Sequence, residues 1–320
     1  MKRTFSLALI AMAIVVSACH SASAPNPPVV FTRASTIAAS SIAGSYETFA
    51  ATGTGNITPT TYVTGGATTL SNVYGLAYDS SGNLWVGNCS GSPAVDEFAA
   101  GATGNVAPAV AITGANTTFI CPAAIDVVSS GKIYVADYND VAIDVFNAGA
   151  NGNVAPATQI IGGATGLHGP NAVAVDASGN IWVTNYTGAS IEEFSSSATG
   201  NATPLVTISG GLTTLSAPDG IVIDRHGNLW VANYGGNSIL EFASTASGNV
   251  APANTISGAS TNLSSPTGIA VDGKGYIYED GAGVNAVNVF APGATGNATP
   301  TQTIAGGATD LSDTWGLAIH

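Results

Sequence analysis

Residues 220–257 read GIVIDRHGNLWVANYGGNSILEFASTASGNVAPANTIS, and short apolar runs alternate here with turns rich in Gly, Asn and Ser. This pattern is typical of short strands joined by tight connections. Gly227 suits the positive φ of a tight turn, and Pro252 suits the start of an edge strand because proline donates no ladder hydrogen bond. The stretch therefore predicts a four-stranded antiparallel sheet, with strands at 220–224, 229–233, 238–242 and about 254–257.

The same pattern repeats along the chain with a period of 48 residues, apart from one interval of 49. The Phe that ends the third strand recurs at Phe49, Phe98, Phe146, Phe194, Phe242 and Phe290. A Gly-Asn pair recurs in step, beginning at Gly55, Gly104, Gly152, Gly200, Gly248 and Gly296. A proline follows each pair, at Pro59, Pro108, Pro156, Pro204, Pro252 and Pro300. Three landmarks with one period indicate a repeat protein.

Four antiparallel strands in each repeat of about 40 to 50 residues are typical of a propeller blade. We therefore predict an all-β fold, a six-bladed β-propeller over residues 35–320. The chain ends at 315–320 with a first strand that has no successors, and it begins near Thr36 where a second strand belongs. We expect the C-terminal strand to pair with the three N-terminal strands and so complete the sixth blade. Closure of this kind removes exposed sheet edges.

The charge of the chain excludes several classes of function. The formal net charge is −13, with only six Lys and Arg residues in 320. A domain this acidic repels phosphate backbones, so we expect no nucleic-acid partner. Adhesion of the domain surface to an anionic membrane is disfavoured for the same reason. We expect a monomer.

The N-terminus reads as an export signal. Lys2 and Arg3 precede an apolar run at 5–16, which is shorter than the roughly 20 residues that span a bilayer but suits a signal peptide. Val16-Ser17-Ala18-Cys19 resembles the lipobox of bacterial lipoproteins. This resemblance implies a signal peptide at 1–18, acylation (palmitate) of Cys19 and a flexible tether at 19–34. Ordinary signal cleavage after Ala24 is the alternative.

The export signal predicts an exported protein, either periplasmic or at the cell surface, that a lipid anchor holds at a membrane. In the fifth repeat, Gly268-Ile269-Ala270-Val271-Asp272 followed by Gly275, Ile277 and Tyr278 resembles the NHL repeat. The resemblance implies a fold of the superfamily that contains streptogramin lyase and regucalcin-like lactonases. The resemblance predicts the fold specifically but says little about the function, because propellers of this type serve many roles.

At some positions the residue differs from repeat to repeat. The fold does not dictate the residue there, so such positions are candidates for function. The residue before each first strand is one such position: Tyr74, Ala123, Asn171, Asp219, Thr267 and Trp315. We expect these side chains to face one opening, called the top, where they would suit a small polar ligand, a sugar or a peptide end. His168, in the loop before the third blade, is a further candidate. The alternatives are solvated loop residues and, for His168, a loop hydrogen bond.

A second set of residues follows the second strand: Cys89, Tyr138, Tyr186 and Tyr234. The tyrosines recur, so we interpret them as packing residues. Cys89 and Cys121 lie in top loops of neighbouring blades, and an oxidising exported compartment permits a disulfide between them. We predict that bond.

Three carboxylates occupy positions that are apolar or small in other repeats, namely Asp126, Glu279 and Asp280. A carboxylate at such a site is unfavourable unless it is paired, hydrated or bound to metal. We expect hydrated channel carboxylates or, alternatively, ligands of a divalent cation. Regucalcin-like lactonases place Glu, Asn and Asp ligands around a central cation, and this resemblance implies that Asn171, Asp219, Asp126 and Glu279 could imitate the set. We expect no other cofactor.

Three hypotheses for the function follow from these features. The first, which we favour, is a membrane-anchored binding scaffold whose top face holds a protein, a peptide or a glycan. The second is an enzyme, either a metal-assisted hydrolase (a lactonase) or a lyase. The third is a structural envelope lipoprotein that has no small-molecule site.

Overall fold

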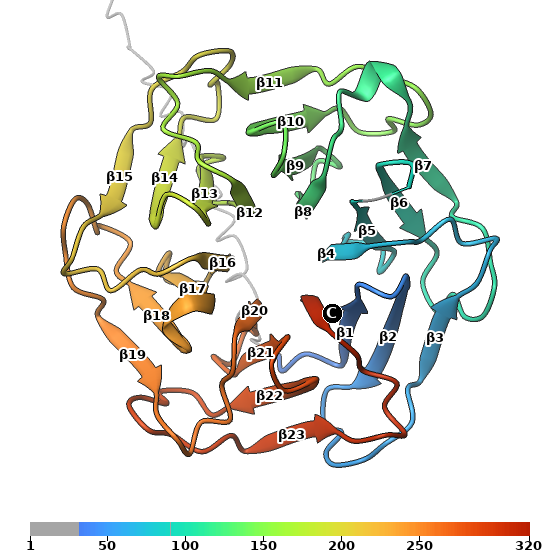
Figure 1. Cartoon of the computed structure of the whole chain (residues 1–320), viewed down its shortest axis with the longest axis vertical. Helices are drawn as coiled ribbons and strands as arrows, with labels where there is room; N and C mark the ends of the chain where they lie inside the picture. The colour runs from blue at the N-terminus through green and yellow to red at the C-terminus, as the bar shows by residue number, and fades with distance from the viewer. Residues whose placement is uncertain (1–31, 90) are drawn as a thin grey trace, which may run out of the picture. The chain divides into compact units, whose positions relative to one another are not determined.

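Twenty-four strands form six separate four-stranded sheets around a common axis (Figure 1). The computed structural model describes residues 32–89 and 91–320, and these belong to one unit, Thr32–His320. The predicted signal peptide, the Cys19 lipidation site and the tether up to residue 31 lie outside the described residues. The fold is the predicted all-β, six-bladed propeller.

The blades follow one another along the chain, and every blade runs from an inner to an outer strand (Figure 1). Blade one contains β4 (Val73–Tyr78), β5 (Leu84–Asn88), β6 (Ala94–Phe98) and β7 (Val110–Thr113). Blade two contains β8 (Pro122–Val127), β9 (Ile133–Asp137), β10 (Ala142–Phe146) and β11 (Thr158–Ile161). Blade three contains β12 (Pro170–Val175), β13 (Ile181–Asn185), β14 (Ser190–Phe194) and β15 (Val206–Ser209).

Blade four contains β16 (Pro218–Ile223), β17 (Leu229–Asn233), β18 (Ser238–Phe242) and β19 (Asn254–Ser257). Blade five contains β20 (Pro266–Val271), β21 (Ile277–Gly281), β22 (Ala286–Phe290) and β23 (Gln302–Ala305). Blade six joins both ends of the chain and contains β24 (Thr314–Ile319), β1 (Thr36–Ser41), β2 (Ser45–Ala50) and β3 (Thr61–Thr64). Two single-turn 3₁₀ helices, Ala115–Thr117 and Tyr234–Gly236, lie in loops. No helix among the described residues is long and apolar enough to cross a membrane.

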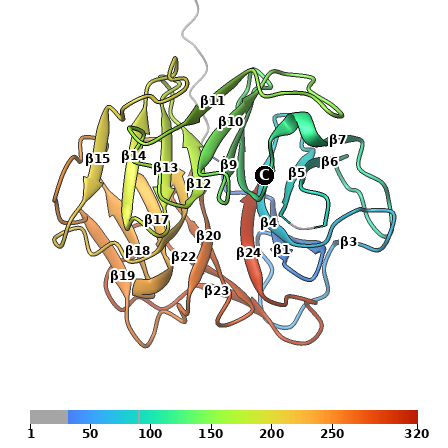
Figure 2. The ribbon, with the colours of Figure 1, turned by 45° about the horizontal axis from the view of Figure 1, so that its top comes forward.

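The last strand closes the ring as predicted. β24 pairs antiparallel with β1, and Ile319, Ala318 and Leu317 lie opposite Ile37, Ala38 and Ala39. Figure 2 shows β24 beside β1 and β4, where the first and last blades meet. The C-terminal strand therefore supplies the inner edge of a sheet whose other three strands come from the N-terminus.

The hydrophobic core lies between adjacent blades. Phe194 of blade three is fully buried and belongs to one cluster with Tyr134 and Ile143 of blade two. Equivalent clusters fill the other gaps between blades, and the six repeated Phe side chains are each no more than 1% exposed. The 48-residue period of Phe thus reflects six equivalent inter-blade contacts.

The repeated Gly-Asn pair links each blade to the preceding one. The connection between the third and fourth strands runs parallel to the neighbour's outer strand, so that Gly200 of blade three bridges Ile160 of blade two. The next residue, Asn201, accepts a hydrogen bond through Oδ1 from the N–H of Ala164, at 2.6 Å. The same parallel bridge occurs at all six blade interfaces, including the one between blades five and six.

Candidate functional site

The divergent residues before each inner strand lie in β-bulges. In blade three, Pro170 lies opposite Asn185 and Ala172 lies opposite Thr184, so Asn171 is an extra residue on its strand. All six inner strands have a register irregularity at this point. A bulge locally turns the strand and re-aims side chains, which explains why these positions face the axis.

Glycine follows the bulged residue in four blades because neighbouring inner strands approach closely there. A Cβ on Gly220 would lie 2.5 Å from the carbonyl oxygen of Thr267, and a Cβ on Gly316 would overlap the carbonyl oxygen of Tyr74. Contacts this short exclude a side chain. The top of the channel is therefore built by close backbone contacts between neighbouring inner strands.

The six inner strands line an axial cavity of about 350 Å³. Its wall contains all six divergent positions, Tyr74, Ala123, Asn171, Asp219, Thr267 and Trp315. A second cavity of about 270 Å³ shares Tyr74, Asn171 and Trp315 with the first and adds loop residues of the top face. Together they form an axial channel with a side-chain-lined mouth, and these volumes suit a small ligand.

Aromatic side chains surround this mouth, and sequence reasoning had interpreted several of them as packing residues. Tyr138 and Tyr186 line the second cavity, and Tyr234 stacks on Trp315 with ring centroids 5.9 Å apart. Trp315 also meets Tyr74 edge to face at 5.3 Å. The available signal was the recurrence of Tyr directly after the second strand, at the same end of the blade as the bulges.

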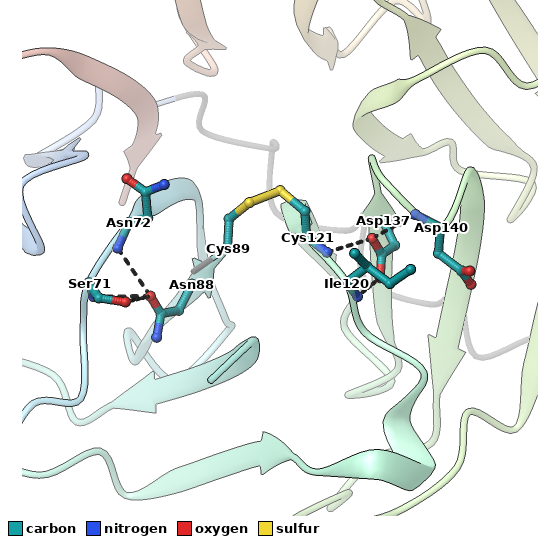
Figure 3. The surroundings of a disulfide bond; sticks show 8 residues. All are labelled: Ser71, Asn72, Asn88, Cys89, Ile120, Cys121, Asp137 and Asp140. Carbon is teal, nitrogen blue, oxygen red and sulfur yellow. Dashed lines mark hydrogen bonds between the residues drawn. A yellow bond between two sulfur atoms is a disulfide. The ribbon is translucent and has the colours of Figure 1, made fainter. Parts of the chain in front are cut away.

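The predicted disulfide between Cys89 and Cys121 is present (Figure 3). Both cysteines line the second cavity at the mouth. Asn88 holds the first loop, because its Oδ1 accepts the N–H of Ser71 at 3.0 Å. Asp137 holds the second loop, because it accepts the N–H of Cys121 at 2.8 Å. The disulfide joins blades one and two across one sector of the mouth.

Asp219 is the most buried carboxylate in the channel wall, with 5% of its surface exposed. Its Oδ1 accepts a hydrogen bond from Asn171 Nδ2 at 2.6 Å. Its Oδ2 has no hydrogen-bond partner among the described residues. Burial, together with the nearby Asp280 carboxylate, raises the pKa of Asp219 well above its ordinary value.

The hydroxyl of Thr267 makes hydrogen bonds inside the protein and does not face the opening. Its hydroxyl donates to Oδ1 of Asp280 at 2.9 Å, and the N–H of Gly268 donates to the same oxygen at 2.5 Å. Burial raises the pKa of Asp280 to about 6 despite these hydrogen bonds. Asp280 therefore lies behind the wall that Thr267 forms.

Asp126 and Glu279 lie in different environments. Asp126 lines the channel and accepts the N–H of Val175 at 2.8 Å, and burial raises the pKa of Asp126 to about 6. Glu279 is fully buried inside blade five, where its Oε2 accepts a hydrogen bond from Asn288 at 2.9 Å. Glu279 does not line the channel because it lies on the second strand, one layer farther from the axis.

The acidic candidate ligands are not gathered into one cluster. Within residues 32–89 and 91–320, no three His, Cys, Asp or Glu side chains are grouped so that they could hold a metal ion. A calcium ion takes six to eight oxygen ligands, whereas Asn171 presents its amide nitrogen to Asp219. Of the four residues that the lactonase resemblance implied, Asp126, Asn171 and Asp219 line the channel, whereas Glu279 lies outside its wall.

His168 is exposed in the loop before β12 and lines neither cavity. Its backbone N–H donates to Asn185 Oδ1 at 3.0 Å, and its carbonyl accepts from the Thr187 hydroxyl at 2.7 Å. This arrangement corresponds to the alternative interpretation, that of a loop hydrogen-bonding residue.

A further set of buried carboxyl groups was missed in the sequence. The middle residue of the third strand is Glu47, Asp96, Asp144 and Glu192 in four blades, and all four are buried. Blade four has Leu240 and blade five has Asn288 at the same position. The substitution by Leu shows that the fold does not require a carboxyl group there.

The fold and its channel define a six-bladed β-propeller with an axial, ligand-sized cavity. The chain belongs to the SMP-30/gluconolactonase/LRE-like family, whose model matches residues 16–209, more than half of the sequence. No curated protein matches closely enough to count as a relative.

Solved structures share the fold at low sequence identity. A chain of a nidogen/laminin complex is 18% identical with a TM-score of 0.63, over 89% of this chain and 98% of that one. A protein from Lactobacillus plantarum is 14% identical with a TM-score of 0.58, over 85% and 83%. A streptogramin B lyase is 15% identical with a TM-score of 0.51, over 77% and 86%. Likeness at these identities shows the fold alone.

Proposed function

We propose that this protein is an exported, membrane-anchored binding scaffold that holds a ligand at the mouth of its axial channel. The observation that carries the proposal is the mouth itself. Side chains that differ from blade to blade line two connected cavities there, whereas the rest of each blade repeats. Concave sites with aromatic walls and a few convergent polar groups are the usual form of small-ligand sites.

The anchoring part of the proposal rests on the sequence. The motif Val16-Ser17-Ala18-Cys19 supports acylation of Cys19, and several acyl chains give stable attachment to a membrane. Growth of expressing cells with labelled palmitate tests this point. We expect label in the wild-type protein and none in Cys19→Ser, and label retained in that variant would refute the anchor.

A thermal-shift panel of sugars, short peptides, amino acids and amines tests the binding site. A ligand that binds the folded state raises the unfolding temperature. We expect at least one class to stabilise the wild-type protein and to lose this effect in Trp315→Ala. Leu212→Ala is the matched control, since Leu212 is 60% exposed and lines neither cavity. Absence of stabilisation by every class would refute the proposed site.

Catalysis is the second candidate, and membership of a family whose description names gluconolactonase favours it. The structural neighbours include a nidogen/laminin complex as well as a lyase, so the fold accommodates binding and catalysis alike. A lactone-hydrolysis assay with and without added divalent cation distinguishes the two. Turnover that disappears in Asp219→Asn would support the enzyme, and absence of turnover would support the scaffold.

A further inference from the structure

Five aromatic side chains form a continuous arc around the mouth. In order they are Tyr138, Tyr186, Tyr234, Trp315 and Tyr74, with successive ring centroids 6.3, 5.7, 5.9 and 5.3 Å apart. All five are half-buried, so part of each ring remains accessible. The faces of aromatic rings carry partial negative charge. The wall of the mouth is therefore apolar and electron-rich at once.

A buried carboxyl group lies at the base of this arc. Asp219 lines the channel below the mouth, and its Oδ2 has no hydrogen-bond partner in the described part of the chain. The Asp219 carboxylate is close enough to Tyr74 and Tyr186 to raise the pKa of both, in addition to the effect of their burial. A buried, unpaired carboxylate oxygen is unfavourable unless something compensates it.

Within the part of the chain that the structure describes, no positively charged side chain lies near this carboxylate. The described residues that line the two cavities include no Lys, Arg or His. Lys132, Arg225 and Lys274 lie in turns between the first and second strands, at the opposite end of the blades from the mouth. Arg33 precedes β1 at that same end and packs over the ring of Tyr276 at 4.3 Å. Any positive charge that balances the ionised form of Asp219 therefore has to come from a ligand.

We infer that the mouth binds an organic cation, an alkylammonium or quaternary ammonium group, between the aromatic arc and the Asp219 carboxylate. This inference rests on the proposed function and specifies the ligand of that site. A cation over aromatic faces is attracted by the ring quadrupole, most strongly where water is excluded. The arc supplies the rings, and Asp219 supplies the counter-charge below them.

Other ligands fit the mouth less well. A divalent metal ion needs several oxygen ligands, and the aromatic wall offers ring faces in their place. A sugar needs convergent hydrogen-bonding side chains. Apart from the tyrosine hydroxyls, the polar side chains that line the second cavity are Asn139 and Asn171. The Asn171 amide is already bonded to Asp219.

Cation binding should be linked to loss of a proton from Asp219. The titratable groups that face Asp219 are Asp280 from β21, Tyr74 from β4 and Tyr186 from the loop after β13. None of them is basic, and Asp280 itself raises the pKa of Asp219. A bound cation has the opposite effect and favours the ionised carboxyl group. The affinity for a cation should therefore increase with pH until Asp219 is ionised without ligand.

Calorimetric titration of the purified protein with choline, at constant ionic strength, tests this inference. The comparison ligand is the neutral isostere of choline in which carbon replaces nitrogen. We expect choline to bind at least about tenfold more tightly than the isostere. We expect Asp219→Asn to abolish that preference while leaving the unfolding transition cooperative, and Asp310→Asn, an exposed top-face carboxylate outside both cavities, to preserve it.

Proton release provides a second measurement. Titrations in two buffers of different ionisation enthalpy should show a proton released on choline binding by the wild-type protein and none by Asp219→Asn. Equal binding of choline and its isostere, both lost in Trp315→Ala, would overturn the cation inference and leave the ligand site in place. Absence of choline binding by folded protein, with a sugar or peptide bound instead, would also overturn it. Failure of every ligand class in the thermal-shift panel would refute the site itself.

Discussion

The side chain of Asn201 fills the space directly in front of the α-carbon of Gly162. A Cβ on Gly162 would lie 2.5 Å from Oδ1 of Asn201, and Gly162 has a φ of +128°. Asn201 belongs to blade three and Gly162 follows the outer strand of blade two. The same glycine–asparagine contact recurs at every blade interface. One contact between neighbouring blades therefore explains why both residues repeat.

Disruption of the contact between Gly162 and Asn201 should destabilise the propeller by a predictable amount. Asn201→Ala loses one hydrogen bond at the surface and should lower the free energy of unfolding by about 1 kcal/mol. Gly162→Ala adds a collision and an unfavourable φ, so it should cost about 1 to 3 kcal/mol. Gly163→Ala is the control, because a Cβ there meets no atom within 4 Å. Urea denaturation measures the free energy of unfolding of all three variants. Equal effects of Gly162→Ala and Gly163→Ala would contradict a stabilising role for the contact.

The disulfide should stabilise the first and second blades. It closes a segment with a sequence separation of 32, which corresponds to about 3.5 kcal/mol of loop-closure entropy. The double variant Cys89→Ser, Cys121→Ser should therefore unfold at a clearly lower urea concentration than the wild-type protein. Reduction of the wild-type protein should reproduce the effect and should leave the double variant unchanged. A reducing agent that destabilises both proteins equally would contradict this assignment.

The stability of the fold should decrease from pH 5 to pH 8. Burial raises the pKa of Glu47 to about 8 and the pKa values of Asp96 and Asp144 to about 7. In this window the folded state keeps protons that the unfolded state has released, so rising pH favours unfolding. Each such group costs about 1.4 kcal/mol per pH unit while only the folded state holds its proton.

Asp96→Asn tests this pH dependence at one site. Burial raises the pKa of Asp96 to about 7, and Asn is a neutral isostere of the protonated carboxyl group, so the amide should be tolerated. Urea midpoints of the variant should vary less between pH 5 and pH 8 than those of the wild-type protein. A wild-type protein that becomes more stable as the pH rises would show that these carboxyl groups are ionised in the folded state.

Truncation at the C-terminus should abolish the fold. β24 pairs only with β1, and its Leu317 and Ala318 side chains are buried between blades. A chain that ends at Thr314 exposes one edge of β1 and opens the channel, so we expect no cooperative thermal transition by circular dichroism. Replacement of the exposed His320 by Ala is the control. A truncated chain that melts like the full-length protein would contradict ring closure by β24.

The fold could be predicted from the 48-residue repeat. The site could be predicted only in part, because some of its residues lie in loops. Phe49 to Phe290 fixed the number of blades, and the C-terminal strand followed from counting positions. The reason for the Gly-Asn pair stayed hidden because Asn201 contacts a residue 37 positions earlier in another blade. Strand positions such as Asp219 were placed correctly at the channel. For His168 the choice between a ligand contact and a loop hydrogen bond stayed open, because a loop conformation does not follow from strand alternation.

The tyrosines show a different limit. Recurrence of Tyr138, Tyr186 and Tyr234 indicated packing, and these rings do pack on one another. Their second role depends on Trp315, which comes from the end of the chain and meets Tyr234 only in the closed ring. A contact between residues 81 positions apart, in different blades, leaves no local pattern.

Tryptophan fluorescence tests ligand binding at the axial mouth most directly, because Trp315 lies there. Trp315 lines the mouth, whereas Trp230 is buried at the other end of its blade, where it donates to Asp224. A saturating ligand should change tryptophan fluorescence in the wild-type protein and in Trp230→Phe but not in Trp315→Phe. A change that persists in Trp315→Phe and disappears in Trp230→Phe would place the ligand elsewhere and contradict the account.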